Sequence, residues 1–434
     1  MRCNQVFVFV MAAALRHDEE DLTMQIRLSS IPRQWLHAAA VLMASATPAA
    51  VALAWGETHP HVFAPAVVAA AHAVPVPTVR ADDLVPTLAR RPLEGAMAAV
   101  QAEVSRGAFP GAALALGRGS RAELVKGIGG TTGAGDHVDA ERTVYDLASL
   151  TKVVATTTAA MLLYEDGLLE LDAPVSRYLP EFSGGGKDAV TVRHLLTHTA
   201  GLPAGATPRG ASPDARLASL IRTPLERSPG EKVEYSDVGF VVLFAALERA
   251  AGEPIPALLE RRVWEPLGMA STGYAPGEDC ERCAPTYRSS EGRPVAGVVH
   301  DPIARALDGV AGNAGLFSTA GDLSRYAAML ASGGELDGVR VLDAATIDTF
   351  AVRQEGTRAL GWETPSANGT GPVGRSMSDR AFGHTGFTGT SLWVDPEHGT
   401  WAVLLTNRVY NTEAPNRMQK LRRTVHALVT EAAE

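Results

Sequence analysis

Strand-forming sequence lies at both ends of residues 92–434, and helix-forming sequence lies between these ends. Near the start, GAALALGRGSRAELVKGIGG (residues 111–130) contains two strand-like runs around a Gly-Arg-Gly-Ser turn, which is typical of a β-hairpin. Near the end, GTSLWVDPEHGTWAVLLTNRV (residues 389–409) contains a second hairpin that turns at residues 395–399. If the two hairpins pair, they form one antiparallel sheet, and the intervening chain packs beside it.

Helices are predicted next to these hairpins and between them. One begins near residue 91, where a proline suits the first turn, and ends near residue 106. Another runs to about residue 166 and is stopped by Gly167. Residues 170–285 are mostly helical in pattern, and an amphipathic helix starting at about Pro415 closes the chain. The predicted fold class is therefore α/β (α+β): an antiparallel sheet flanked by N- and C-terminal helices, plus an all-helical lobe, with ligands bound in the cleft between them.

The first 91 residues have a different composition from the rest. Residues 24–54 begin with Met24 and contain a basic start, an apolar stretch and the small-x-small site Ala52-Leu53-Ala54, which indicates a secretory signal. We interpret residues 1–54 as an overcalled start plus a signal peptide, residues 55–91 as an Ala/Pro-rich linker, and residues 92–434 as the main folded domain. Export to the periplasm or the medium is expected. Retention as a membrane anchor is the alternative, although Ala, Ser, Thr and Pro make a weak spanning helix.

Composition narrows the partners and cofactors. The net charge is −9 and the basic residues are scattered, so no nucleic-acid surface is expected. Cys280 and Cys283 form a C-x-x-C without further zinc ligands nearby, and in an exported protein a local structural disulfide is favoured. His194 and His198 are spaced i, i+4, but no H-E-x-x-H pattern accompanies them. We therefore expect neither a metal nor a cofactor.

The segment YDLASLTKVV, which starts at Tyr145, places Ser149 three residues before Lys152 in an apolar run. On a helix these side chains share a face, with Cβ atoms roughly 5–6 Å apart. A serine hydroxyl needs a neighbour that accepts its proton, and burial is expected to lower the pKa of the lysine so that it can share in that work. A Ser-x-x-Lys pattern alone also occurs by chance, with the lysine reaching solvent and the serine capping a helix.

Two further motifs lie downstream of the Ser-x-x-Lys pattern. EYSDVGF contains Tyr235-Ser236-Asp237, and FGHTGFTG contains His384-Thr385-Gly386 just before a strand pair. Ser-x-x-Lys, a Tyr-x-Asn-like triplet and Lys/His-Thr-Gly in this order resemble the serine β-lactamase and penicillin-binding-protein superfamily. The tyrosine, together with HLLTHTAGLP from His194, resembles the class C β-lactamase, DD-peptidase and esterase branch. The resemblance covers roughly residues 93–434.

The resemblance implies a role for each matching residue. Ser149 is the expected nucleophile, Lys152 shares its proton, and Tyr235 is the expected general base. The backbone amides of Ser149 and Phe387 are expected to form the oxyanion hole. Substrate-binding residues are expected at four positions: Asp237, His384, Thr385 and Gly386.

Two positions depart from the family pattern. Asp237 stands where Asn is usual, and an ionised Asp can only accept a hydrogen bond. Asp237 can still hold Lys152 by charge, but it would keep the lysine protonated. His384 stands where efficient β-lactamases carry Lys, and a neutral imidazole attracts a carboxylate weakly. Both departures argue against β-lactam hydrolysis as the main activity.

Other polar residues leave alternatives open. His300 and Asp301 either lie on the cleft rim or cap loop backbone, and Asn313 is expected to hold a turn. Asn407-Arg408 either reaches a substrate carboxylate or fixes the final loop, and the second is favoured.

The function expected from the sequence is an exported serine hydrolase that works through an acyl-enzyme. Its substrate is a D-alanyl peptide from peptidoglycan or a small ester, with weak β-lactam turnover. A penicillin-binding sensor that is acylated without turnover is the alternative. The sequence leaves the oligomeric state open.

Overall fold

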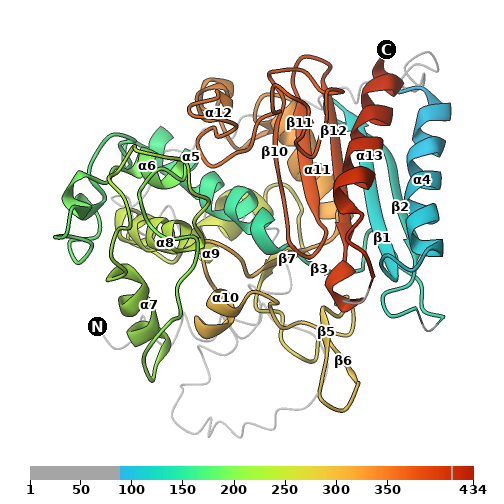
Figure 1. Cartoon of the computed structure of the whole chain (residues 1–434). Helices are drawn as coiled ribbons and strands as arrows, with labels where there is room; N and C mark the ends of the chain where they lie inside the picture. Colours follow the sequence, from blue (N-terminus) through green and yellow to red (C-terminus); the bar gives the residue numbers. More distant parts are fainter. Residues whose placement is uncertain (1–87, 134, 412–413) are drawn as a thin grey trace, which may run out of the picture. The chain divides into compact units, whose positions relative to one another are not determined.

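A five-stranded antiparallel sheet joins the two ends of the described chain, in the order β10-β11-β12-β1-β2 (Figure 1). The computed structural model describes residues 88–133, 135–411 and 414–434, so the predicted signal segment and nearly all of the linker lie outside the described residues. Leu114 of β1 lies opposite Leu404 of β12, which confirms that the two predicted hairpins pair. The strands are β1 (Gly111–Arg118), β2 (Arg121–Gly129), β10 (Phe382–Thr385), β11 (Ser391–Asp395) and β12 (Thr400–Thr406).

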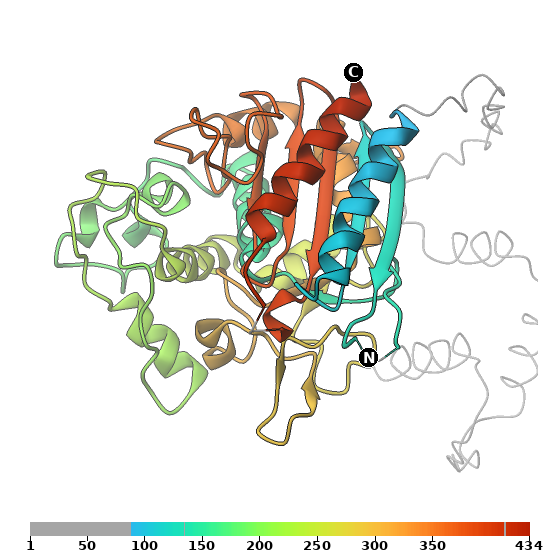
Figure 2. The same ribbon diagram turned by 45° about the vertical axis from the view of Figure 1, so that its right-hand side comes forward.

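Helices bury both faces of this sheet. Helices α4 (Arg90–Ser105) and α13 (Met418–Ala433) lie side by side on one face, as Figures 1 and 2 show, and α11 (Ala320–Ala331) packs on the other. Ala402 and Leu404 belong to the apolar cluster under α4 and α13, whereas Val403 and Leu405 belong to the cluster on the opposite side. Because both of its faces are buried, β12 carries an unbroken apolar run over residues 401–405.

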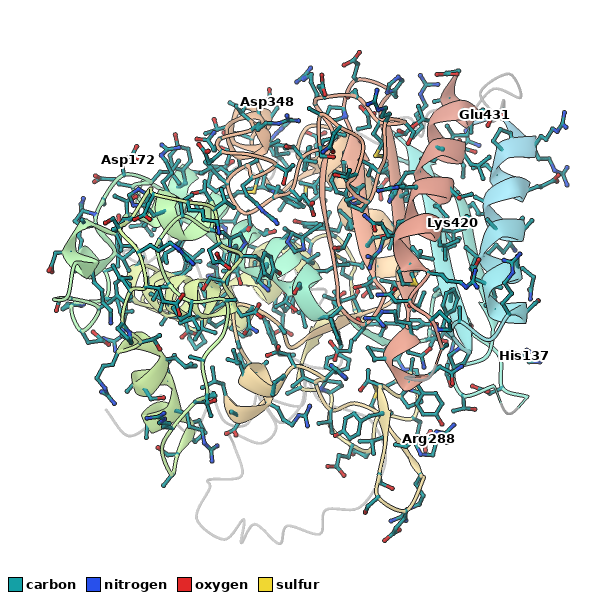
Figure 3. The ribbon with its side chains drawn as sticks, in the orientation of Figure 1. His137, Asp172, Arg288, Asp348, Lys420 and Glu431 are labelled. Atoms are coloured by element: carbon teal, nitrogen blue, oxygen red, sulfur yellow. A yellow bond between two sulfur atoms is a disulfide. The ribbon has the colours of Figure 1, made fainter. Side chains whose placement is uncertain are left out.

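The outer surface of the helix pair is polar. Figure 3 labels Lys420 and Glu431, two exposed charged residues of α13. This distribution matches the amphipathic pattern predicted for the closing helix. The helix begins at Met418, three residues after the predicted start at about Pro415.

The predicted helical lobe is present beside the sheet (Figure 1). The helix that follows the nucleophile motif is composite, with a 3₁₀ turn (Ala148–Leu150), a π-helical turn (Lys152–Thr157) and then α5 (Thr158–Glu165). Gly167, with φ +69°, follows its end as predicted. The other helices of the middle region are α6 (Val192–Leu196), α7 (Pro213–Ile221), α8 (Asp237–Ala251), α9 (Ile255–Leu259), α10 (Pro302–Ala306) and α12 (Ala344–Ala351).

Several very short strands were not predicted, because two or three residues are too few to show an alternating pattern. A second sheet has the order β3-β7-β4 and contains β3 (Tyr145–Asp146), immediately before the nucleophile motif. Its other strands are β4 (Gly273–Tyr274) and β7 (Leu316–Ser318). Two small hairpins are formed by β5 (Tyr287–Arg288) with β6 (Pro294–Val295) and by β8 (Glu335–Leu336) with β9 (Val339–Arg340).

The C-x-x-C motif forms the local disulfide that was predicted, between Cys280 and Cys283. Among the described residues, no helix combines the length and the apolar character needed to cross a bilayer.

Candidate active site

Ser149 lies on a tight turn that other side chains hold in place. Its neighbour Ala148 has φ +47°, a left-handed conformation that costs energy for a non-glycine residue. The buried Asp146 carboxylate accepts a hydrogen bond from the Ala148 amide (2.8 Å) and another from the His300 amide (2.7 Å). Thr390 donates to the Leu147 carbonyl (2.9 Å). The surrounding contacts therefore fix the backbone that presents the serine.

Lys152 is completely buried, and its ammonium points at the serine. Nζ donates to Ser149 Oγ (3.0 Å), to Asp237 Oδ1 (2.6 Å) and to the Asn313 carbonyl (3.0 Å). Three acceptors use all three donors of a charged ammonium. The structure thus brings Ser149 and Lys152 together as predicted. The Asn313 turn is joined to Lys152 by its carbonyl and to Asp301 Oδ1 by its side-chain Nδ2 (3.0 Å).

The charge state of Lys152 is set by its partners and not by burial alone. Burial alone lowers the pKa of the ammonium, but the charges of Tyr235 and Asp237 outweigh burial and raise the pKa above its ordinary value. The lowering expected from the apolar helix alone is wrong, whereas the charge that Asp237 was expected to maintain on Lys152 is confirmed. A lysine in this state donates to the serine hydroxyl and has no free lone pair with which to accept its proton.

Tyr235 lies against this pair on the opposite wall. Its ring centroid is 4.8 Å from Lys152 Nζ and 4.5 Å from the centroid of His198, which is buried. His198 Nδ1 accepts a hydrogen bond from the Ser236 amide (3.0 Å), so the imidazole fixes the backbone of the second motif. His194 instead completes a capping box with Thr191 at the start of α6. The two histidines thus have separate structural contacts.

Asp237 is the first residue of α8, and Ser236 caps that helix by accepting a bond from the Gly239 amide (2.9 Å). A carboxylate is stabilised at this position by the helix dipole. Asp237 therefore remains an acceptor facing Lys152, as its identity predicted.

Gly386 brings the third motif close to the nucleophile turn. A Cβ at this position would lie 2.0 Å from Thr390 Oγ1 and 2.5 Å from the Leu147 carbonyl oxygen, so only glycine fits. Within the described residues, the next amide, that of Phe387, has no hydrogen-bond acceptor in the protein. An amide without an acceptor is what an oxyanion hole requires, so the role of Phe387 stays a prediction.

His384 is buried in β10, and its ring stacks on that of Tyr235 with centroids 5.9 Å apart. Its Nδ1 contacts the Thr385 carbonyl (2.8 Å), so Nδ1 carries the proton. Burial, followed by the charges of Arg358 and Lys152, lowers the pKa of His384 well below its ordinary value. The imidazole is neutral at pH 7, and the third motif therefore contributes no charge.

A cavity of about 330 Å³ opens over these groups, large enough for a small ligand. Ser149, Tyr235 and the third motif contribute to its walls. Three arginines also line it, of which Arg358 and Arg422 were not identified from the sequence. The lining residues are Ser149, Tyr235, Arg358, Glu363, His384, Thr385, Gly386, Phe387, Arg408, Asn416, Met418 and Arg422.

The sequence left two roles open for His300, Asp301 and Asn407, a place at the cleft or the capping of loop backbone. The His300 ring stacks on the exposed Phe387 ring (centroids 5.6 Å apart), whereas Asp301 caps α10 by accepting from the Ala304 amide (2.8 Å). Asn407 fixes loops by donating to the Thr131 (2.7 Å) and Pro285 (2.9 Å) carbonyls.

The Arg408 amide helps to fix the loop by donating to the Thr388 carbonyl (3.0 Å), but its side chain has a different place. Its guanidinium lies over the Phe387 ring at 4.9 Å and lines the cavity.

The antiparallel sheet, the helical lobe and the Ser149–Lys152–Tyr235 cluster together define a serine hydrolase. The family model described as Beta-lactamase matches residues 96–427. The chain belongs to the Beta-lactamase family, which confirms the predicted fold and the predicted resemblance.

Individual relatives agree with this assignment. A protein of Escherichia coli strain K12 named "Putative D-alanyl-D-alanine carboxypeptidase" is 32% identical over 63% of this chain and 70% of its own length. An N-acetylmuramyl-L-alanine amidase of Bacillus subtilis strain 168 is 33% identical over 62% of this chain and 68% of its own. The crystal structure of a class C β-lactamase from Rhodobacter sphaeroides covers 78% of this chain and 99% of its own, with a TM-score of 0.61 and 23% identity. At 23% identity, the similarity to this β-lactamase structure shows the fold alone.

Proposed function

We propose that the protein hydrolyses an amide or ester bond through an acyl-enzyme formed on Ser149. The observation that carries the proposal is the 3.0 Å hydrogen bond from Lys152 Nζ to Ser149 Oγ at the floor of the cavity. A charged lysine orients the hydroxyl but does not accept its proton, so Tyr235 is the remaining base on that side of the cleft.

The proposed reaction has two halves. The Ser149 oxygen attacks the substrate carbonyl carbon, and the serine proton passes to the phenolate oxygen of Tyr235. The C–N or C–O bond then breaks, and Tyr235 returns the proton to the departing amine or alcohol. Water next attacks the acyl-enzyme and gives a proton to Tyr235, and that proton goes back to the Ser149 oxygen as the acid leaves. The amides of Ser149 and Phe387 stabilise the oxyanion in both halves.

We infer that the acyl donor carries a free carboxylate, as a D-alanyl peptide of peptidoglycan does. Arg358, Arg408 and Arg422 all line the cavity, and guanidinium groups bind carboxylates with two parallel hydrogen bonds. Within the described residues, the Arg408 side chain makes no hydrogen bond to the protein, so it is available to a ligand. The names of the Escherichia coli and Bacillus subtilis relatives support a cell-wall substrate.

A small neutral ester is the second candidate. Asp237 cannot donate to a substrate amide carbonyl, and His384 is neutral. Both features favour substrates that need neither contact.

We further propose that the protein is exported. The signal-like residues 24–54 support export, and so does the Cys280–Cys283 disulfide, because such bonds persist in oxidising compartments.

Product release tests the proposal. The purified protein is given a peptide ending in D-alanyl-D-alanine, the same peptide with an amidated C-terminus, and p-nitrophenyl acetate. We expect repeated turnover of the free-acid peptide, much slower turnover of the amidated peptide, and none with Ser149→Ala. Preference for the acetate would favour the esterase, and one acylation without release would favour a penicillin-binding sensor.

A further inference from the structure

Four side chains with ionisable groups surround the Tyr235 ring. Their distances to its centroid are 4.5 Å for the His198 ring, 4.8 Å for Lys152 Nζ, 5.3 Å for the Arg358 guanidinium carbon and 5.9 Å for the His384 ring. As a general base, Tyr235 has to be ionised in the reactive state. The charges of these neighbours therefore decide how easily that state forms.

Two of the four neighbours supply no net charge, and a third shares its charge. The Lys152 ammonium interacts with Tyr235 and also with the Asp237 carboxylate at 2.6 Å. Burial lowers the pKa of both His198 and His384 well below the ordinary value, so both imidazoles are neutral.

Arg358 is different because its charge is not paired. Among the described residues, no carboxylate lies within ion-pair distance of its guanidinium, and its buried Nε has no hydrogen-bond partner. The backbone holds it in place: its amide donates to the Glu355 carbonyl (2.8 Å), and its carbonyl accepts from the Gln354 amide (2.7 Å). A guanidinium over an aromatic face is itself a favourable contact.

Three other charged residues line the cavity with Arg358, namely Glu363, Arg408 and Arg422, and the Arg408 guanidinium lies over the Phe387 ring. Burial raises the pKa of Glu363, and the charges of Arg358 and Arg422 oppose this shift without reversing it. Arg422 faces the third motif, where it donates to the Gly386 (3.0 Å) and Thr390 (2.7 Å) carbonyls.

We propose that Arg358 is a positioning residue whose guanidinium, seated on the Tyr235 ring, stabilises the ionised phenol that accepts the serine proton. The proposal rests on the proposed function, because it assigns a residue that acts through Tyr235. It adds a residue outside all three sequence motifs, from the loop between α12 and β10, to the machinery of the site.

The test is the pH profile of Ser149 acylation by p-nitrophenyl acetate, followed by intact-protein mass and product release. This ester has no carboxylate, so loss of direct binding of an anionic substrate to Arg358 cannot explain a change. Arg358→Gln removes the charge and keeps much of the side-chain length. Arg358→Lys keeps the charge, and Arg380→Gln removes an exposed arginine charge at the surface as a matched control.

Arg358→Gln is expected to move the rising limb of the acylation rate by about one unit to higher pH, which is about a tenfold loss at pH 7. In Arg358→Lys the rising limb should stay close to its pH in the unchanged protein, and in Arg380→Gln it should not move. An unchanged limb in Arg358→Gln, or an equal loss at every pH, would overturn the proposal. If Arg358→Gln fails to fold, Arg358→Lys provides the test. Because lysine keeps the charge, a shift of its rising limb by about one pH unit would also overturn the proposal. Absence of any adduct on the unchanged protein would instead overturn the proposed function.

Discussion

The Lys152 ammonium donates to the Asp237 carboxylate across 2.6 Å, which ties the helix after the nucleophile to the first turn of α8. The pair keeps the lysine charged and places it 3.0 Å from Ser149 Oγ. A charged donor in this position orients the nucleophile and leaves proton transfer to another group. The first two predictions test this division of roles.

Tyr235→Phe should slow acylation and deacylation together, by about 10²–10⁴-fold, because both halves of the reaction lose the same acid–base group. Rapid-mixing measurement of the burst and the steady state with p-nitrophenyl acetate separates the two rates. Tyr164→Phe, at a partly exposed tyrosine, is the control and should behave as the unchanged protein. A variant that binds substrate more weakly but reacts at the normal rate would contradict the role of Tyr235.

Asp237→Asn should raise acylation by β-lactams about tenfold, roughly the worth of one added hydrogen bond. The amide can donate to an acylamide carbonyl, which the carboxylate cannot do, and Lys152 loses its nearest negative charge. Labelling by a fluorescent penicillin measures the rate. An unchanged rate would show that residue 237 does not contact the substrate.

Gly386→Ala should lower kcat by about 10²–10³-fold, the usual cost of one lost oxyanion donor. The new methyl group collides with Thr390 Oγ1 and the Leu147 carbonyl, so the Phe387 amide has to move away from Ser149. Gly205→Ala is the matched control, because a Cβ there meets nothing within 4 Å. Full activity in a folded Gly386→Ala variant would remove Phe387 from the oxyanion hole.

Asp146 gives a prediction for stability. Burial raises the pKa of this carboxyl from 3.8 to about 6, although the His300 and Ala148 amides oppose the shift. Between these two values the native state binds more protons than the unfolded state, so this residue favours folding increasingly as the pH falls through about 6. In thermal unfolding, the Tm of the unchanged protein should therefore rise relative to that of Asp146→Asn as the pH falls from 7.5 to 4.5. A difference in Tm that is independent of pH would contradict the assignment.

The sequence predicts the sheet because the hairpin residues 111–130 and 389–409 carry their pattern locally. It also predicts Ser149, Lys152 and Tyr235, because each lies in a short motif. It does not reveal Arg358 or Arg422, because no motif marks them and they reach the cavity only through the packing of a loop and α13. The apolar helix alone suggests a lowered pKa for Lys152, whereas Asp237, 85 residues away in the second motif, indicates the retained charge that the structure shows.

The most direct test of the central claim is intact-protein and peptide mass spectrometry after brief mixing with a penicillin and with a D-alanyl-D-alanine peptide. The account predicts a covalent acyl group on Ser149 that disappears with time, that persists longer in Tyr235→Phe, and that never forms in Ser149→Ala. An acyl group on another residue, or turnover by Ser149→Ala, would contradict it.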